Sequence, residues 1–218
     1  MAAELEQYLD SSDLCDFDKC AAIGEKAHQL AGGCRHPGEA FESVFSFVKE
    51  MPYGLEDWDV KASETLAKGW GMCSGKTNLL VALLRSLGIP VRYRVFKIST
   101  EAELWSSMIG DERMADRLGS APVQQDHVDC EVWLGGWRQV DPARDTALER
   151  GMQAMGIPLE RKPVLDDSGQ ANVLLLASVD EWARERQARR RFRKNRDETF
   201  AWVNAQFERM RELGRQVT

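Results

Sequence analysis

The chain has 218 residues, of which 43% are hydrophobic, and its formal net charge is −6. This length and composition fit a soluble globular protein with a sizeable core, and they exclude a fibrous or disordered chain. No stretch approaches 18 continuous apolar residues, so the sequence predicts no membrane-spanning helix and no membrane partner.

The first 36 residues are predicted to form an acidic arm followed by a first helix. Residues 1–66 hold 14 acidic side chains against 5 basic ones. The opening segment, MAAELEQYLD, lacks the basic and then apolar run of a signal peptide. The chain has five cysteines, an odd number, which suits a reducing compartment where thiols stay unpaired. We therefore expect a cytoplasmic protein.

Several metal-binding residue types fall close together in and just after this arm. They are Cys15, Cys20, His28, Cys34 and His36. Thiolate and imidazole are the usual ligands of zinc, so a zinc site has to be considered. However, the spacing contains no Cys-x2-Cys pair, and the register of a helix starting at Cys20 turns Cys20 and His28 away from any shared point. We expect no metal and no other cofactor.

Residues 37–178 are predicted to form the main domain. Its first helix begins at Pro37 and ends at Glu50, because apolar residues repeat there at i, i+3, i+4 and i+7. A turn-rich connection follows, containing a short helix that we expect Ser63 to cap and Gly69 to end. These elements are interpreted as packing elements that bring the chain to the next helix.

A cysteine between glycines, Cys73, stands at the start of a strongly apolar helix that runs to Leu87. Unpaired backbone N–H groups and the positive dipole end at a helix start favour a thiolate, so Cys73 is a candidate nucleophile. The alternative is a buried, inert cysteine. An oxyanion hole beside a reactive thiol would use the backbone N–H of Cys73 and an indole N–H, for which Trp58 and Trp70 are candidates.

The sheet is predicted to begin after this helix, because residues 91–98 alternate as in a half-buried strand. Residues 99–122 are interpreted as a polar, helical insertion with three apolar anchors, Trp105, Met108 and Ile109. Residues 127–134 alternate again, Gly135 and Gly136 form a turn, and residues 137–142 return as the next strand. This hairpin begins with a histidine and ends with an aspartate.

A thiol at a helix start, a histidine that opens a strand and an aspartate that closes the next strand are the parts of a catalytic triad. Cys73 would be the nucleophile, His127 the general base and Asp141 the group that orients the base. Asp126 and Asp129 are rival orienting groups, since both lie close to His127 along the chain.

The triad makes a geometric demand on the hairpin. A two-residue turn at the glycine pair would set Cys130 against Asp141 and point His127 and Asp141 to opposite faces. A three-residue loop or a bulge can shift the register, so that Asp129 opposes Asp141 and His127 becomes its diagonal neighbour on the same face. We therefore predict an odd-length turn or a bulge, with both side chains facing the start of the Cys73 helix.

Together these strings resemble the transglutaminase-like superfamily, which shares the papain-like cysteine proteinase fold. The resemblance covers about residues 40–145 and rests on Cys73 with the helix LLVALLRSLGIPVRY, on His127 with EVWL, and on the tryptophan and aspartate of WRQVDP. It implies an α+β fold in which a central helix carrying the cysteine packs on a small antiparallel sheet. It also implies a peptidase, an amidase or deamidase, or a transglutaminase-type enzyme, acting on an amide through a thioacyl intermediate with the triad Cys73, His127 and Asp141.

Two other functional interpretations remain beside this one. The family usually has an aromatic residue soon after the histidine, where this chain has Val128 and Asp129, a departure that concerns substrate contacts. A non-catalytic binding module, which keeps the same fold and holds a partner in its cleft or on its basic helix, is the alternative hypothesis. Nucleotide binding through Gly75, Lys76 and Thr77 is less favoured, because a phosphate loop needs a glycine where this chain has a tryptophan. The expected partner is a protein, peptide or small amide substrate.

Residues 179–218 are predicted to form a basic helical extension. Eight basic side chains lie between Arg184 and Arg196, and such a patch can bind nucleic acid. We favour a solvated helix face that pairs with the acidic N-terminal third, so nucleic acid is not an expected partner. An apolar stripe then follows at helical spacing, made by Phe200, Val203, Phe207 and Met210. It either docks on the domain or joins two subunits in a homodimer.

Overall fold

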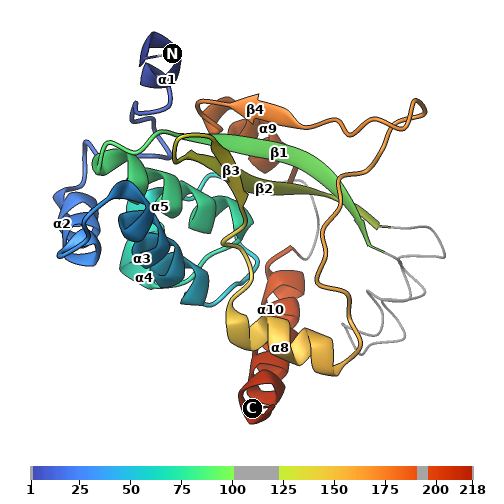
Figure 1. The fold of residues 1–218 in the computed structure, drawn as a ribbon. Helices are drawn as coiled ribbons and strands as arrows, with labels where there is room; N and C mark the ends of the chain where they lie inside the picture. Colours follow the sequence, from blue (N-terminus) through green and yellow to red (C-terminus); the bar gives the residue numbers. More distant parts are fainter. Residues whose placement is uncertain (1, 101–122, 191–195, 218) are drawn as a thin grey trace.

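The structure, a computed structural model, describes residues 2–100, 123–190 and 196–217 (Figure 1). It shows the predicted α+β fold, with one four-stranded antiparallel sheet in the order β3-β2-β1-β4 and helices packed around it. Residues 99 and 100 continue a strand, and the rest of the predicted helical insertion, with Trp105, Met108 and Ile109, lies outside the described residues.

Along the part of the chain that the structure describes, five helices precede the strands β1 to β3, and α8 then separates these strands from β4, which α9 and α10 follow. The helices are α1 (Ala2–Glu6), α2 (Ala21–Ala31), α3 (Pro37–Glu50), α4 (Ala62–Lys68), α5 (Cys73–Ser86), α8 (Thr146–Ala154), α9 (Asp180–Arg190) and α10 (Arg196–Gln216). The strands are β1 (Val91–Thr100), β2 (Val123–Trp133), β3 (Trp137–Val140) and β4 (Leu174–Leu176). Helices α2 to α5 gather on one side of the sheet, and α8 and α10 lie together at one end of it (Figure 1).

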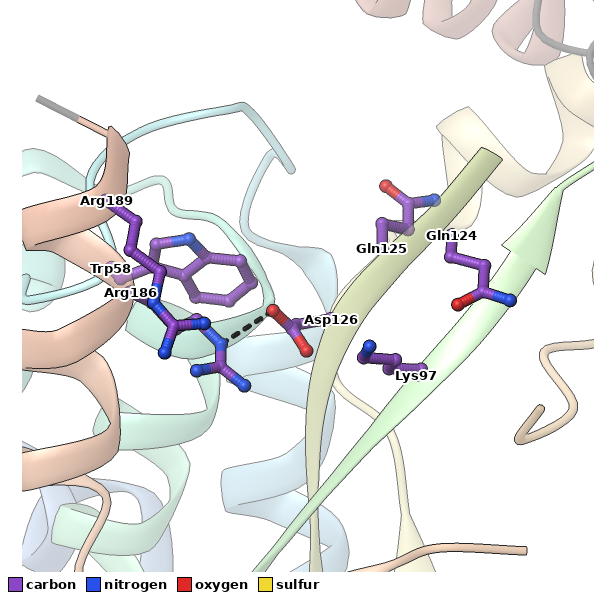
Figure 2. A pocket seen from close by; sticks show the side chains of 7 residues that line it. All are labelled: Trp58, Lys97, Gln124, Gln125, Asp126, Arg186 and Arg189. Carbon is purple, nitrogen blue, oxygen red and sulfur yellow. Dashed lines mark hydrogen bonds and ion pairs between the residues drawn. The ribbon is translucent and has the colours of Figure 1, made fainter. Parts of the chain in front are cut away.

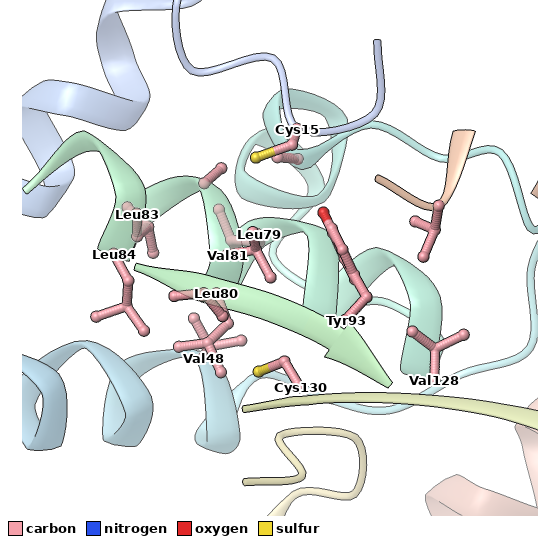
Figure 3. Packing of buried hydrophobic residues seen from close by; sticks show 14 of the residues in the cluster. Cys15, Val48, Leu79, Leu80, Val81, Leu83, Leu84, Tyr93, Val128 and Cys130 are labelled. Carbon is pink, nitrogen blue, oxygen red and sulfur yellow. The ribbon is translucent and has the colours of Figure 1, made fainter. Parts of the chain in front are cut away.

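The core lies between α5 and the inner face of the sheet. Every residue of α5 from Cys73 to Arg85 is buried, and its apolar side chains face β1 and β2 (Figure 3). The strands contribute alternate residues to this face, namely Val91, Tyr93, Val95, Val128, Cys130 and Val132. Burying one leucine or valine side chain of this kind contributes about 1.5–3 kcal/mol. The alternation predicted from the sequence is therefore what holds α5 against the sheet.

The start of α4 differs from the prediction, because Ser63 is not its cap. Lys61 occupies the cap position, and its backbone N–H donates to Glu64 Oε2 at 3.0 Å. Ser63 instead donates its backbone N–H and its hydroxyl to the Asp16 carboxylate, at 3.0 and 2.6 Å. A carboxylate at a helix start is favoured by the dipole, so the distant aspartate takes the role that the local pattern assigned to serine. The helix ends as predicted at Gly69, whose φ is +74°.

The hairpin between β2 and β3 has the odd-length turn that the sequence predicts. Trp133 pairs with Trp137 and Cys130 pairs with Val140, so residues 134–136 form a three-residue loop. Gly135 adopts a φ of +87°, which glycine accepts without strain. The strand β3 ends at Val140, and Asp141 follows it directly.

The C-terminal helix α10 docks on α8 through a second apolar cluster. The cluster contains Leu148, Met152, Ile157, Val203, Phe207 and Met210. The two helices approach very closely, because a Cβ added at Gly151 would lie 1.8 Å from the Met210 carbonyl oxygen. The predicted apolar stripe thus docks within the chain, except for Phe200, which is half-buried outside this cluster. A homodimer through this helix stays a prediction.

The basic stretch pairs with acids in two places. Arg196 Nη1 lies 2.8 Å from Asp57 Oδ1, which confirms one contact with the acidic N-terminal third. Arg186 Nε lies 2.7 Å from Asp126 Oδ2 on β2, a partner that the sequence did not suggest. None of the helices in the described ranges is long and apolar enough to cross a membrane. The division of the chain after residues 36 and 178 stays a prediction.

Candidate active site

The glycines on either side of Cys73 make room for a carboxylate. A Cβ added at Gly75 would lie 2.6 Å from Glu56 Oε1, and one added at Gly71 would lie 3.1 Å from the same atom. Glu56 accepts the backbone N–H of the residue before Cys73 at 2.8 Å and forms an ion pair with Lys68. The carboxylate therefore braces the start of α5, although burial raises its pKa above the usual value.

Lys76 is fully buried in the first turn of α5. Its Nζ donates to the backbone carbonyls of Lys49 at 3.1 Å and Met51 at 2.5 Å. Burial lowers the pKa of Lys76 to about 7. Gly75 faces Glu56 as described above, and Lys76 is directed at backbone carbonyls, so these residues do not form a phosphate site. The nucleotide-binding interpretation therefore has no structural basis.

Thr77 joins the start of α5 to the strand that carries His127. Its hydroxyl donates to the Val128 carbonyl at 3.2 Å. Backbone carbonyls lie in the plane of a sheet and point toward a neighbouring strand or an open edge. Because β3 ends at Val140, it does not reach Val128, so the Thr77 hydroxyl binds the edge of β2 that β3 leaves open. Cys73 lies one turn before Thr77. The structure thus brings the Cys73 end of α5 alongside the His127 end of β2.

His127 and Asp141 are hydrogen-bonded to each other. His127 Nε2 lies 3.0 Å from Asp141 Oδ2, and Asp141 Oδ1 accepts the backbone N–H of Ala143 at 2.9 Å. The imidazole is 4% exposed and packs edge-on against Phe96, with ring centroids 5.2 Å apart. The carboxylate is 30% exposed. The pair therefore has its histidine in the interior and its acid toward the surface, on one side of the sheet.

An arginine that the sequence did not suggest completes this cluster. Arg161 Nη1 lies 2.6 Å from Asp141 Oδ2 and 3.3 Å from His127 Nε2. A guanidinium only donates, so the two nitrogens share the carboxylate as acceptor, and His127 Nε2 carries the proton. Burial would raise the pKa of Asp141, but the charges of Arg161 and His127 outweigh it and hold that pKa well below the usual range.

The same surroundings also lower the pKa of the His127 imidazole. Burial lowers the pKa of His127, and Arg161 lowers it further, while the Asp141 carboxylate raises it. The net shift is downward from the ordinary value of 6.5. Near neutral pH the cluster therefore holds an ionised Asp141 and a neutral His127 beside the Arg161 guanidinium.

The two rival acids are held by other partners. Asp129 accepts hydrogen bonds from Arg94 Nη1 at 3.0 and 2.9 Å, and burial raises its pKa to about 7. Asp126 is paired with Arg186. Neither of them is hydrogen-bonded to His127, which binds Asp141 instead.

The arrangement of ligand atoms could in principle hold a cation. One atom from each of His127, Asp129 and Asp141 lies within 4.8 Å of the others. Arg94 and Arg161 already neutralise the two carboxylates and would repel a metal ion. In the part of the chain that the structure describes, the N-terminal cysteines and histidines form no such group. The expectation that no metal is bound stays a prediction.

The two tryptophans proposed for an oxyanion hole lie in different places. Trp58 is buried, packs edge-on against Trp182 with ring centroids 5.0 Å apart, and lines a pocket of about 310 Å³ together with Asp126 (Figure 2). The Lys68 ammonium lies over the ring of Trp70, 4.6 Å from the ring centroid. Trp70 is not among the residues that line this pocket.

Several residues of the cluster were not found from the sequence. Arg161 lies in an irregular stretch between α8 and β4, 20 positions after Asp141, where no periodicity or motif marks it. Glu56 lies in the connection before α4 and is likewise unmarked. Arg94 and Asp129 are different, because they are directly opposed in the β1–β2 ladder. Their opposite charges could have been matched once the register of these strands was known.

Comparison with known proteins gives one family match and one similar structure. The model of the transglutaminase-like superfamily matches residues 24–142, more than half of the chain. The crystal structure of a candidate cysteine protease from Cytophaga hutchinsonii is similar at 16% sequence identity with a TM-score of 0.48. That alignment covers 80% of this chain but 54% of the other, so the chain spans about half the length of that protein. A comparison with curated proteins gave no match.

Proposed function

Because the chain belongs to the transglutaminase-like superfamily, we propose that it is a thiol-dependent enzyme that transfers an acyl group from an amide. Cys73 is the nucleophile, His127 the general base and Asp141 the orienting acid. The hydrogen bond of 3.0 Å between His127 Nε2 and Asp141 Oδ2, beside the Cys73 end of α5, carries the proposal. With Nε2 bound to the acid, Nδ1 is the nitrogen that takes the thiol proton.

The reaction proceeds through a thioacyl intermediate. The Cys73 thiolate attacks the amide carbonyl carbon, the carbon–nitrogen bond breaks, and His127 gives its proton to the leaving amine. Water or a second amine then attacks the thioester, gives up a proton to His127, and releases the acyl product and the Cys73 thiol. Peptidase, amidase or deamidase, and transglutaminase-type reactions share the first half. The backbone N–H of Cys73 and the indole of Trp58 or Trp70 would stabilise the oxyanion.

Arg161 supports this mechanism through its charge. It favours an ionised Asp141, which in turn fixes the tautomer in which His127 Nε2 carries a proton. Burial lowers the pKa of His127, and the same Arg161 charge, which disfavours an imidazolium, lowers it further. His127 therefore rests as a neutral base that can accept the thiol proton.

Selective alkylation tests the thiol chemistry. Cys73 is 3% exposed, whereas Cys20 and Cys34 are half-buried and more accessible to a reagent. Burial raises the pKa of Cys15 to about 11 and that of Cys130 well above its usual value, so both should be inert. A trace of iodoacetamide should label Cys73 first. Equal labelling, or preference for the more exposed cysteines, would favour the non-catalytic binding module.

Trapping of the acyl enzyme tests the reaction itself. The protein is incubated with a peptide library or a cell lysate, quenched in acid, and examined by mass spectrometry of the peptide that contains Cys73. A mass increase on Cys73 should identify the acyl group. The Cys73→Ala variant should show no adduct and no activity with an unchanged circular dichroism spectrum. Full activity in this variant would end the proposal.

A further inference from the structure

A pocket with an excess of positive charge lies where α9 meets β1 and β2. Its charged residues are Lys97, Asp126, Arg186 and Arg189, and Trp58 and two glutamines complete its lining (Figure 2). We call this the basic pocket. Arg186 and Arg189 come from α9, which lies beyond the residues that match the family model. The pocket is therefore assembled in part from a segment that lies outside the family match.

The chain topology places the basic pocket near the Cys73 end of α5. Helix α5 connects through residues 87–90 to β1, which runs back antiparallel to it, so the start of α5 lies toward the far end of β1. Lys97 lies near that end and pairs with Asp126 in the ladder between β1 and β2. Both side chains share the face of the sheet that carries the buried Val95 and Val128, because residues two apart point the same way.

The distances along helix and strand agree with this placement. The Thr77 hydroxyl reaches the Val128 carbonyl, and Cys73 lies four residues, about 6 Å along the helix, before Thr77. Asp126 lies two residues, about 6.6 Å, before Val128 in the corresponding direction. The core residues end at Val128, and the basic pocket occupies the next stretch of the same face.

The charges of the basic pocket are only partly neutralised. Asp126 is already bound to Arg186, with Nε and Oδ2 2.7 Å apart. Lys97 is exposed and forms no ion pair with any residue that the structure describes. Arg189 is 72% exposed, and the carboxylate of Glu185 is 3.9 Å from it. Two cations are thus presented to a ligand, beside the indole of Trp58 and the two glutamine amides.

We propose that the basic pocket is a substrate subsite that selects acyl donors with a carboxylate close to the scissile amide. This inference rests on the proposed function of Cys73. Arg189 offers a planar pair of N–H donors that matches a carboxylate, and Lys97 adds a second charge on the opposite side of the pocket. The Arg186–Asp126 pair holds α9 against β2 and so fixes Arg189 relative to Lys97.

A matched pair of reagents tests the subsite. N-iodoacetyl-β-alanine and its primary amide carry the same reactive group at the same reach and differ only in a carboxylate. Both alkylate a thiolate with release of iodide, and saturation kinetics at Cys73 give a binding constant for each. The acid should bind roughly tenfold more tightly than the amide, the size expected from one charge-assisted contact. Added salt should reduce this preference, because the pocket is partly exposed.

Two double variants test whether the preference for the acid over the amide depends on the basic pocket. Lys97→Gln with Arg189→Gln should abolish it, and both positions are exposed enough to be changed without harm to the fold. Lys19→Gln with Arg209→Gln removes the same charges from exposed positions elsewhere and should leave the preference unchanged. Equal binding of acid and amide to the wild type, or a preference that survives Lys97→Gln with Arg189→Gln, would overturn the subsite.

A second measurement separates the subsite from the thiol chemistry. In the Cys73→Ala variant, fluorescence anisotropy compares a glutamate-containing peptide with its glutamine counterpart, each carrying an uncharged dye. Tighter binding of the glutamate peptide, lost in the Lys97 and Arg189 variant, supports the basic pocket whether or not Cys73 reacts. Equal binding of the two peptides overturns the subsite and leaves the proposed role of Cys73 to the labelling experiment.

Discussion

The two halves of α5 are buried to the same degree, yet they are built from different side chains. The second half is an apolar run from Leu79 to Leu84, with every residue fully buried against the sheet and the surrounding helices. The first half carries four buried polar residues, Ser74, Lys76, Thr77 and Asn78. Three of these donate to backbone carbonyls in other segments, where Lys76 contacts Lys49 and Met51, Thr77 contacts Val128, and Asn78 contacts Val60.

The apolar half of α5 mainly contributes to the stability of the fold, whereas the polar half mainly contributes to the geometry of the candidate site. An apolar side chain gains free energy by leaving water, whereas a buried polar group costs free energy unless it is hydrogen-bonded. The polar half therefore adds little net stability. Its hydrogen bonds instead fix the segments around Cys73 relative to one another, including the connection before α4 and the strand that carries His127. We expect the two halves to respond to substitution in different measurements.

The largest expected effect lies in the cluster beside the polar half. His127→Gln keeps an N–H donor for Asp141 but removes the base, so activity should fall by about 10²–10⁴-fold. Steady-state rates with the trapped substrate measure this, and the melting temperature should change little. Asp141→Ala should cost less, because an orienting group fixes a tautomer and does not move the proton. Wild-type activity in Asp141→Ala would transfer the orienting role to Asp126 or Asp129.

The next effect concerns the apolar half. Leu80 is fully buried, so Leu80→Ala should lower the free energy of unfolding by about 2–5 kcal/mol, measured by urea denaturation. The rate of Cys73 alkylation in the folded protein should stay unchanged. Leu80→Met, which nearly conserves volume, should cost less than about 1.5 kcal/mol. A loss of Cys73 reactivity in the folded Leu80→Ala protein would break the separation between the two halves.

Arg161→Gln should shift the pH dependence of the site. A cation beside an imidazole disfavours the imidazolium, so its removal should raise the pKa of His127. Both limbs of the pH profile for Cys73 alkylation should then move to higher pH. Histidine NMR in a Cys73→Ala background reports the pKa of His127 directly. Lys162→Gln is the control, since Lys162 is exposed and pairs with Glu160. An unchanged profile would contradict the role given to Arg161.

The smallest effect tests the contact that joins helix and strand. Thr77→Val keeps the shape of the side chain but removes the hydroxyl bound to Val128, which should cost about 1 kcal/mol of unfolding free energy. The rate of Cys73 alkylation should also fall, because the start of α5 is no longer held at the edge of β2. Thr77→Ser keeps the hydroxyl and should retain the wild-type rate. Equal rates in both variants would mean that the contact does not position Cys73.

Local patterns account for much of the fold and for the outline of the candidate site. The helix from Pro37 to Glu50, the strand β1 and the hairpin strands β2 and β3 follow from periodicity. Periodicity indicates which side of an element faces the core. The odd-length turn followed from a geometric condition on His127 and Asp141, and the observed register meets it. The capping role of Ser63 was wrong, because Asp16, 47 positions away, binds it instead.

The sequence by itself determined the helix from Pro37 to Glu50, the Cys73 helix, the strand from Val91, the hairpin strands and the three candidate residues Cys73, His127 and Asp141. Only the tertiary structure decided which charges surround them. Arg161 beside Asp141 and Glu56 beside Gly75 are long-range neighbours that no local spacing encodes. Periodicity records which way a side chain points within its own element, whereas an ion pair depends on how separate elements approach. The tertiary packing of the chain therefore decides the electrostatics of this site, whereas the sequence alone is enough to predict its candidate residues.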